Sequence, residues 1–225
     1  MFLRSIISVV FFVVLASNGL CQEHRVESAD GVSDAEGVGA EILAELSPQG
    51  MRIVRGESRT VCTIWTVKLL EVPADFKPTP VRLYPFQPGQ LMGVVQLPRR
   101  TEDFRGQQIS KGWYTLRYAL QPVDGNHVGT SPTQDFLVLI KAEDDPQPAA
   151  LDVETLTERS AAAAGSTHPA MLCLQPVAPH AGNKTVMLHD EGHDWWKLHF
   201  EANTKSGDVA QKQPVDVVVV GKAEE

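Results

Sequence analysis

At 225 residues, the chain is long enough for one substantial domain or two small ones, and its 43% hydrophobic and 21% charged content is ordinary for a globular protein. Its formal net charge is −8. The segment that comes closest to a basic cluster contains Arg99, Arg100 and Arg105, and two acidic residues interrupt it. Because nucleic-acid binding needs a clustered basic surface, we expect no nucleic-acid partner.

The N-terminal segment has the pattern of a secretory signal peptide. Arg4 precedes an apolar run over residues 6–15 (IISVVFFVVL), which is too short to span a bilayer. Small residues follow, and cleavage after Gly19 or after Cys21 fits them. The pattern predicts a signal peptide over residues 1–21 and export to the periplasm or the medium. We expect no transmembrane span in the mature chain.

The three cysteines indicate neither a metal motif nor a lipid anchor. Leu20 stands before Cys21, where a lipidated cysteine normally follows a small residue, so we expect no lipidation there. Cys62 and Cys173 lie in apolar, strand-like runs, which favours two small buried core residues. An oxidising compartment also permits one disulfide between them, and the sequence leaves that pairing open.

Residues 22–46 are predicted to form a flexible acidic linker. They are rich in Gly, Ser, Ala and Glu and contain few large apolar side chains, so they bury too little surface to offset the entropy of ordering. One helical turn over residues 41–46 is compatible with the pattern. The folded domain is then expected to cover residues 47–221 as a single unit.

Within that domain, period-two alternation and β-branched runs predict about eight or nine strands. These runs cover residues 51–55, 61–71, 91–97, 113–121, 135–140, 170–174, 184–189, 194–201 and 214–220. Five prolines between residues 73 and 88 predict a loop or edge segment there, because proline cannot donate to a ladder.

The central hairpin is predicted to join residues 113–121 to residues 135–140. Its core side chains should be those of Tyr114, Leu116, Tyr118, Phe136 and Val138. Thr115, Arg117 and Ala119 fall on the opposite face of the first strand, which is expected to be wet.

The chain has one good helix candidate, over residues 153–164. Asp152 can cap its N-terminus, four alanines extend it, and Gly165 can end it. One helix among eight or nine strands predicts a mostly-β fold, an antiparallel β-sandwich or a distorted barrel.

Residues 106–139 carry a recognisable pattern. Together with Phe104 and Arg105 they read FRGQQISKGWYTLRYALQPVDGNHVGTSPTQDFLVL. This resembles FRGQxIxxGxYTLRYxLQPxDGxHxGxSPxxDFLxL, shared by an uncharacterised family of secreted bacterial proteins, and the similarity extends to residues 50–65 and to the Ala-rich helix before His168. The resemblance implies a secreted, mostly-β protein and no particular activity.

The loop inside the central hairpin is the first candidate site. Asp124, Asn126 and His127, with Asp135 beyond them, place oxygen ligands and an imidazole close together, as a Ca²⁺ or transition-metal site would need. Turn chemistry explains Asp124, Gly125 and Asn126 without any ligand. His127 is the residue that a turn does not require.

The second candidate is the histidine-rich run HDEGHDWWKLHFE, from His189 to Glu201. His189 and His193 flank a tight turn at Gly192, so with His127 they form a candidate divalent-metal site. Alternatively, Trp195, Lys197 and His199 share one strand face, where an indole and an ammonium could hold a sugar or peptide.

Catalytic motifs are lacking. There is no GxSxG, neither Cys62 nor Cys173 has a basic neighbour in sequence, and Asp144 and Asp145 lie on a proline-rich turn, where they are expected to be solvated. The sequence therefore favours an exported, non-enzymatic β-sandwich that binds an unknown extracytoplasmic ligand or protein, or serves as an envelope accessory. The alternatives are a metal-binding protein or metal-dependent enzyme, and a carbohydrate-binding surface around Trp195.

Overall fold

The computed structural model describes residues 23–32, 35–80, 82–121, 133–179 and 181–223. Its elements, in chain order, are β1 (His24–Ala29), α1 (Ala40–Glu45), β2 (Gly50–Arg55), β3 (Arg59–Thr66), β4 (Leu70–Glu71), β5 (Leu91–Leu97), β6 (Thr101–Glu102), β7 (Gln108–Ile109), β8 (Gly112–Leu120), β9 (Asp135–Lys141), the 3₁₀ turn η1 (Ala142–Asp144), α2 (Val153–Ala164), β10 (Met171–Gln175), β11 (Val186–Asp190), β12 (Trp195–Ser206) and β13 (Val209–Val220).

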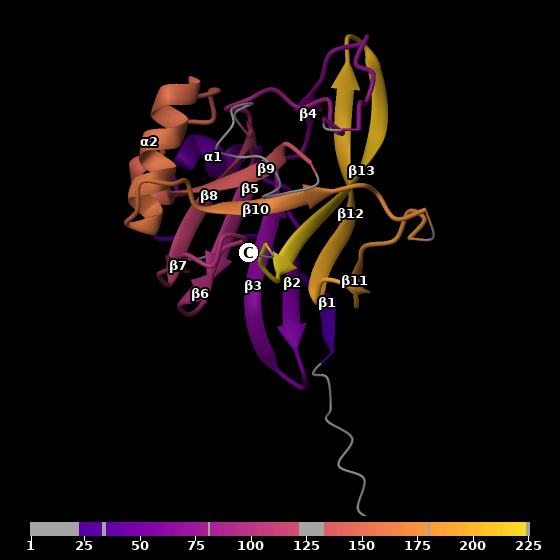
Figure 1. The fold of residues 1–225 in the computed structure, drawn as a ribbon. Helices are drawn as coiled ribbons and strands as arrows, with labels where there is room; N and C mark the ends of the chain where they lie inside the picture. The colour runs from indigo at the N-terminus through magenta and orange to yellow at the C-terminus, as the bar shows by residue number, and fades with distance from the viewer. Residues whose placement is uncertain (1–22, 33–34, 81, 122–132, 180, 224–225) are drawn as a thin grey trace, which may run out of the picture.

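The strands form one curled, open sheet with the shape of a half-barrel (Figure 1). Along it the order is β1-β2-β3-β5-β8-β9-β10-β13-β12-β11, and every neighbouring pair in this order is antiparallel. The short β4 pairs in parallel with β12, while β6 and β7 form a small separate sheet.

The curl is concentrated at β10, which two different strands share. Residues 171–173 pair with β9, and residues 174–175 pair with β13. The phenol of Tyr84 donates to the carbonyl of Gln175 (2.7 Å) and accepts from the backbone N–H of Asp216 (3.0 Å). A buried side chain thus joins β10 to β13 at the corner, where the sheet changes direction.

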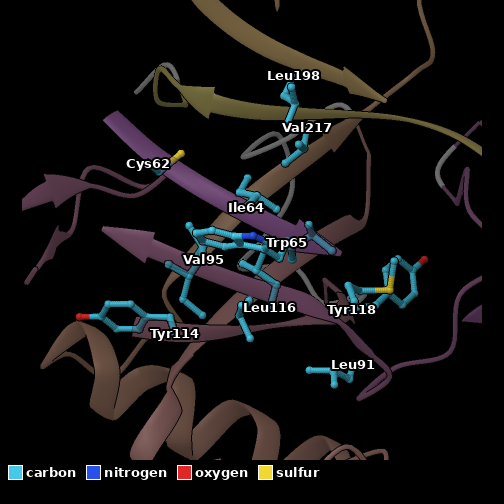
Figure 2. Close-up of a cluster of buried hydrophobic side chains, with 14 of the residues drawn as sticks. Cys62, Ile64, Trp65, Leu91, Val95, Tyr114, Leu116, Tyr118, Leu198 and Val217 are labelled. Atoms are coloured by element: carbon cyan, nitrogen blue, oxygen red, sulfur yellow. The ribbon is translucent and has the colours of Figure 1, made fainter. Parts of the chain in front are cut away.

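The concave side of the sheet is filled by one large apolar cluster. Figure 2 shows Leu198 and Val217, from β12 and β13, lying over Ile64 of β3 and its neighbours on β5 and β8. The side chains predicted as the core of the central hairpin are all buried, which confirms that prediction: Tyr114, Leu116, Tyr118, Phe136 and Val138.

The mostly-β prediction is confirmed, because 46% of the described residues are in strands and 11% are in helices. There are more strands than the eight or nine expected, and they build a single curled sheet rather than the two packed sheets of a sandwich. The helix α2 has the predicted bounds: Asp152 accepts from the N–H of Thr155 (2.9 Å), and Gly165 ends it in the left-handed region at φ 62°. No helix in the described part of the chain is long and apolar enough to cross a membrane.

The prediction of a flexible linker over residues 22–46 is wrong for most of that range. Residues 24–29 form β1, which pairs along its whole length with β2. The buried side chains of Val38, Ile42 and Leu46 follow at helical spacing and belong to the main core. This segment is ordered by tertiary pairing with β2 and the core, which its polar composition does not reveal.

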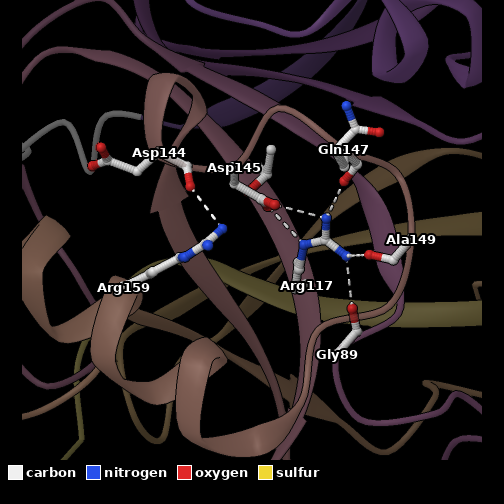
Figure 3. A network of polar contacts seen from close by, with 8 residues as sticks. Gly89, Arg117, Asp144, Asp145, Gln147, Ala149 and Arg159 are labelled. Atoms are coloured by element: carbon white, nitrogen blue, oxygen red, sulfur yellow. Dashed lines mark hydrogen bonds and ion pairs between the residues drawn. The ribbon is translucent and has the colours of Figure 1, made fainter.

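The predicted wet face of β8 is also wrong, because a polar network covers it (Figure 3). Arg117 is 0% exposed and forms a two-pronged ion pair with Asp145, through Nε (2.6 Å) and Nη2 (2.8 Å). Its Nη1 donates to the carbonyls of Gly89 (2.8 Å) and Ala149 (2.7 Å). Asp145, expected to be solvated, is therefore the counter-charge that allows the guanidinium to be buried.

Cys62 and Cys173 are buried thiols that are not joined in a disulfide, which confirms their interpretation as core residues. Burial raises the pKa of the Cys62 thiol to about 12. At neutral pH this thiol is therefore protonated and unreactive.

The buried pair gives a first prediction. Replacement of Arg117 by Met should lower the free energy of unfolding by about 3–5 kcal/mol, because it leaves the carboxylate of Asp145 buried without a counter-charge. Urea unfolding followed by tryptophan fluorescence measures this change.

The matched control is Arg25→Met. Arg25 pairs with Glu27 at the surface, where both side chains are at least one-third exposed, so this substitution should cost about 0–1 kcal/mol. Equal losses in the two variants would contradict the structural role assigned to Arg117.

Candidate functional site

The histidine-rich run forms the hairpin of β11 and β12, and its two tryptophans lie on opposite faces. Trp195 and Trp196 are successive residues of β12, so their side chains point to opposite sides of the sheet. Trp195 packs in a small cluster with Phe104 and Phe136, whereas Trp196 belongs to the main core. Both indoles are buried.

The imidazoles of His189 and His193 follow the two tryptophans. His189 stacks on Trp196 with ring centroids 4.3 Å apart, and His193 stacks on Trp195 at the same distance. The two imidazoles are therefore on opposite faces of the hairpin. This geometry contradicts the expectation of one metal ion shared by His189 and His193.

Each of these histidines instead has an aspartate of its own. Nε2 of His189 lies 2.9 Å from Oδ1 of Asp194, and Nδ1 of His193 lies 3.3 Å from Oδ1 of Asp190. Within the part of the chain that the structure describes, no group of three His, Cys, Asp or Glu is placed to hold a metal ion. Asp124 and His127, from the hairpin loop, lie outside the described residues.

The expected ligand-binding face of Trp195, Lys197 and His199 is not an exposed face. Trp195 is only 4% exposed, because Phe104 and the chain after β13 cover it, and its Nε1 donates to the carbonyl of Lys222 (2.8 Å). Lys197 extends to Asp190 (3.3 Å). The indole of Trp195 is therefore covered and cannot stack on a sugar.

His199 is fully buried and is held at both ring nitrogens. Its Nε2 lies 3.0 Å from the carbonyl of Gly182, and a carbonyl only accepts, so Nε2 carries a proton. Its Nδ1 contacts Oδ1 of Asp216. Because Nε2 is occupied, this His–Asp pair cannot serve as the general base of a catalytic triad. It ties the loop before β11 to β12 and β13.

A fourth histidine, His24, lies where the two edges of the curled sheet approach each other. β1 contacts β11, and the ring of His24 packs against Trp196 at 4.6 Å. Neither of its nitrogens has a hydrogen-bond partner among the described residues. Burial, together with the charge of Arg55, lowers the pKa of His24 to about 4.

Further along β1, past this contact, the two edges of the sheet separate and leave an open cleft of about 360 Å³, which we call the edge cleft. This volume is in the range of small-ligand sites, roughly 300–1,000 Å³. Two other cavities among the described residues hold only about 20 and 10 Å³. The edge cleft is lined by Val26, Glu27, Ser28, Ser47, Gln49, Gly50, Met51, Thr66, Thr185, Phe200, Glu201 and Asn203.

The lining gives the edge cleft a polar rim over a small apolar base. Four hydroxyls, two amides and two carboxylates face it, beside the side chains of Val26, Met51 and Phe200. Such a wall can donate and accept hydrogen bonds in many directions, but it contains no His, Cys or Lys. The arrangement suits binding of a polar ligand.

Sequence reasoning missed the edge cleft because it assigned one wall to a linker. The run HRVESA does alternate, with His24 and Val26 on one side and Arg25 and Glu27 on the other. That alternation is the available indication of a strand. The facing wall, Thr185 and residues 200–203, comes from segments more than 130 residues further along, which no linear pattern brings together with β1.

A scan against known family models found no match, and neither did searches of curated proteins and of solved structures.

The environment of His24 gives a prediction about pH. A folded pKa of about 4, against an unfolded value near 6.5, means that the unfolded chain binds more protons between these two values. Protonation of His24 should therefore lower the free energy of unfolding by about 2 kcal/mol as the pH drops from 6.5 to 4. Urea midpoints at pH 7 and pH 4.5 measure the effect against His24→Gln, which should be less acid-sensitive.

The control is His168→Gln, in an exposed turn, which should keep the acid sensitivity of the parent protein. If His24→Gln and the parent lose the same stability on acidification, His24 is not the group responsible.

Proposed function

We propose that the protein is an exported, non-enzymatic binding module that holds a polar ligand in the edge cleft. The observation that carries this proposal is the cleft itself: about 360 Å³ between two sheet edges, walled by hydroxyl, amide and carboxylate groups. The mouth of an open β-barrel is a common place for a ligand site.

Several side chains with catalytic chemistry are committed to structural contacts. Both nitrogens of His199 are occupied, and the Cys62 thiol is held protonated by burial. Glu27, at the cleft wall, pairs with Arg25 and Arg52, and the hydrogen bond from Arg25 lowers the pKa of its carboxyl. An ionised Glu27 is not a general acid, and no nucleophile–base pair lines the cleft.

Export is the second part of the proposal, and it rests on the sequence of residues 1–21. A ligand bound outside the cytoplasm would be an extracytoplasmic small molecule, a glycan or a segment of another protein. The three are distinguished by the ligand classes in the test that follows.

A ligand screen tests the binding function. Mixed pools of short peptides, oligosaccharides and free amino acids should include one class that raises the melting temperature by about 3–6 °C at tenfold excess over its Kd. Ser28→Trp, which places an indole in the edge cleft, should lose the response.

The matched control is Thr157→Trp, on an exposed face of α2 remote from the cleft (Figure 1), which should keep the response. If no pool stabilises the parent, or if Ser28→Trp responds as well as Thr157→Trp, the assignment of the cleft as the binding site is wrong.

Fractionation of a bacterial expression host tests export. The mature chain should be recovered from the periplasm or the medium, with a new N-terminus at Leu20 or Gln22, as N-terminal sequencing would show. Recovery of the uncleaved chain in the cytosol would contradict the proposal.

A further inference from the structure

The edge cleft lies at a position along β12 where one strand is missing. The side of β12 away from β13 is paired with β11 over residues 195–199 and with β4 at residues 204–205. Residues 200–203 have no strand beside them among the described residues. We call the space between these residues and residues 26–28 of β1 the strand gap.

The strand gap lies in line with a position that a strand already fills. Further down, β11 occupies the same position: it pairs with β12 on one side and contacts β1 on the other. Thr185, directly before β11, lines the cleft, so the gap continues the line of β11. Four residues of β12 at about 3.3 Å each give it a length of about 13 Å.

The backbone of β12 presents hydrogen-bonding groups to the strand gap. The carbonyl of Lys205 accepts from the N–H of Val72 (2.9 Å), so the backbone N–H and C=O groups of Lys205 point away from β13. Because strand residues alternate with period two, those of Asn203 and Glu201 point the same way.

The backbone of β1 does the same from the other side. The carbonyl of Glu23 accepts from the backbone N–H of Gly56 (3.0 Å), so the backbone groups of odd-numbered residues point toward β2. The backbone N–H and C=O groups of even-numbered residues therefore point away from β2. Val26 and Ser28 therefore turn their N–H and C=O groups toward the gap. No described residue bonds to these groups of Val26 and Ser28, or to those of Glu201 and Asn203.

We propose, on the basis of the function proposed for the edge cleft, that its ligand is an extended peptide segment bound as an added strand. In a four-residue extended chain, the backbone N–H and C=O groups of two residues point toward each neighbouring strand. These groups match those of Val26 and Ser28 on one side and of Glu201 and Asn203 on the other. β1 and β12 run in the same direction, since neighbouring strands alternate along the sheet. A peptide that runs like β11 is therefore antiparallel to both.

The walls of the gap specify the side chains of that peptide. Phe200 and Met51 lie on the core side, so residues that point inward should be apolar. Glu201 lies on the outer face and has no ion-pair partner among the described residues, whereas Glu27 is matched by Arg25 and Arg52. A basic or hydroxyl side chain beside Glu201 completes the pattern of an alternating apolar and polar segment.

Backbone methylation provides the direct test. The probes are acetylated, amidated hexapeptides in which Val or Phe alternates with Ser, Lys or Glu, and their affinities are measured by fluorescence anisotropy. For the best binder, N-methylation of one residue at a time should weaken binding by about tenfold or more at the paired positions, since a ladder hydrogen bond is lost and the methyl group blocks approach.

A substitution in the protein tests the same ladder. Ser28→Pro removes the backbone N–H that faces the gap, and it leaves the hydrogen bonds between β1 and β2 in place. It should weaken binding of the peptide by about tenfold. Ser28→Ala removes the same hydroxyl but keeps that N–H, so the tenfold loss is measured relative to Ser28→Ala. If Ser28→Pro does not fold, the methylated peptides carry the test alone.

The outcomes separate the two proposals. Peptide binding that is insensitive to methylation overturns strand addition. Binding of glycans or free amino acids, but not peptides, in a manner lost in Ser28→Trp, overturns strand addition and leaves the binding function intact. No binding by any class contradicts both.

Discussion

The shape of the molecule depends on one short strand that two others share. β10 pairs with β9 through its first residues and with β13 through its last, so the strand order turns a corner there. Tyr84 joins the two sides of that corner through Gln175 and Asp216, with its ring stacked beside Phe86. The curl then brings the first strand of the sheet against the last. The approach of β1 to β11, the burial of His24 and the edge cleft are all consequences of it.

The local features of the fold could be predicted from the sequence, because their causes are local. The bounds of α2 follow from the Asp152 cap and from Gly165, which sit beside the helix they delimit. The alternation in β8 predicted its core face. Burial of Arg117 on its other face could not be predicted, because the cause is a carboxylate at Asp145 on a turn beyond the next strand. β1 was missed for the same reason: its stability comes from β2 and not from its own composition.

The candidate site shows a related limit. His189 and His193 are close in sequence and looked like joint ligands, but strand alternation and a tight turn place them against different tryptophans on opposite faces. The alternation of β12 places the side chain of Trp195 on the outer face of the sheet, yet Phe104 and the segment after β13 cover it. The edge cleft, in contrast, has ordinary polar residues on its walls. It is distinguished by the backbone of two distant strands, which is unpaired among the described residues, and backbone pairing leaves no motif in a sequence.

The central claim is that the facing edges of β1 and β12 are unpaired, and amide hydrogen exchange of the free protein tests it most directly. The N–H groups of Ser28 and Asn203 should exchange orders of magnitude faster than those of Glu27 and Ala202, which point to β2 and β13 on the same two strands. The same protection at all four amides would contradict the account, because it would mean that the strand gap is already closed.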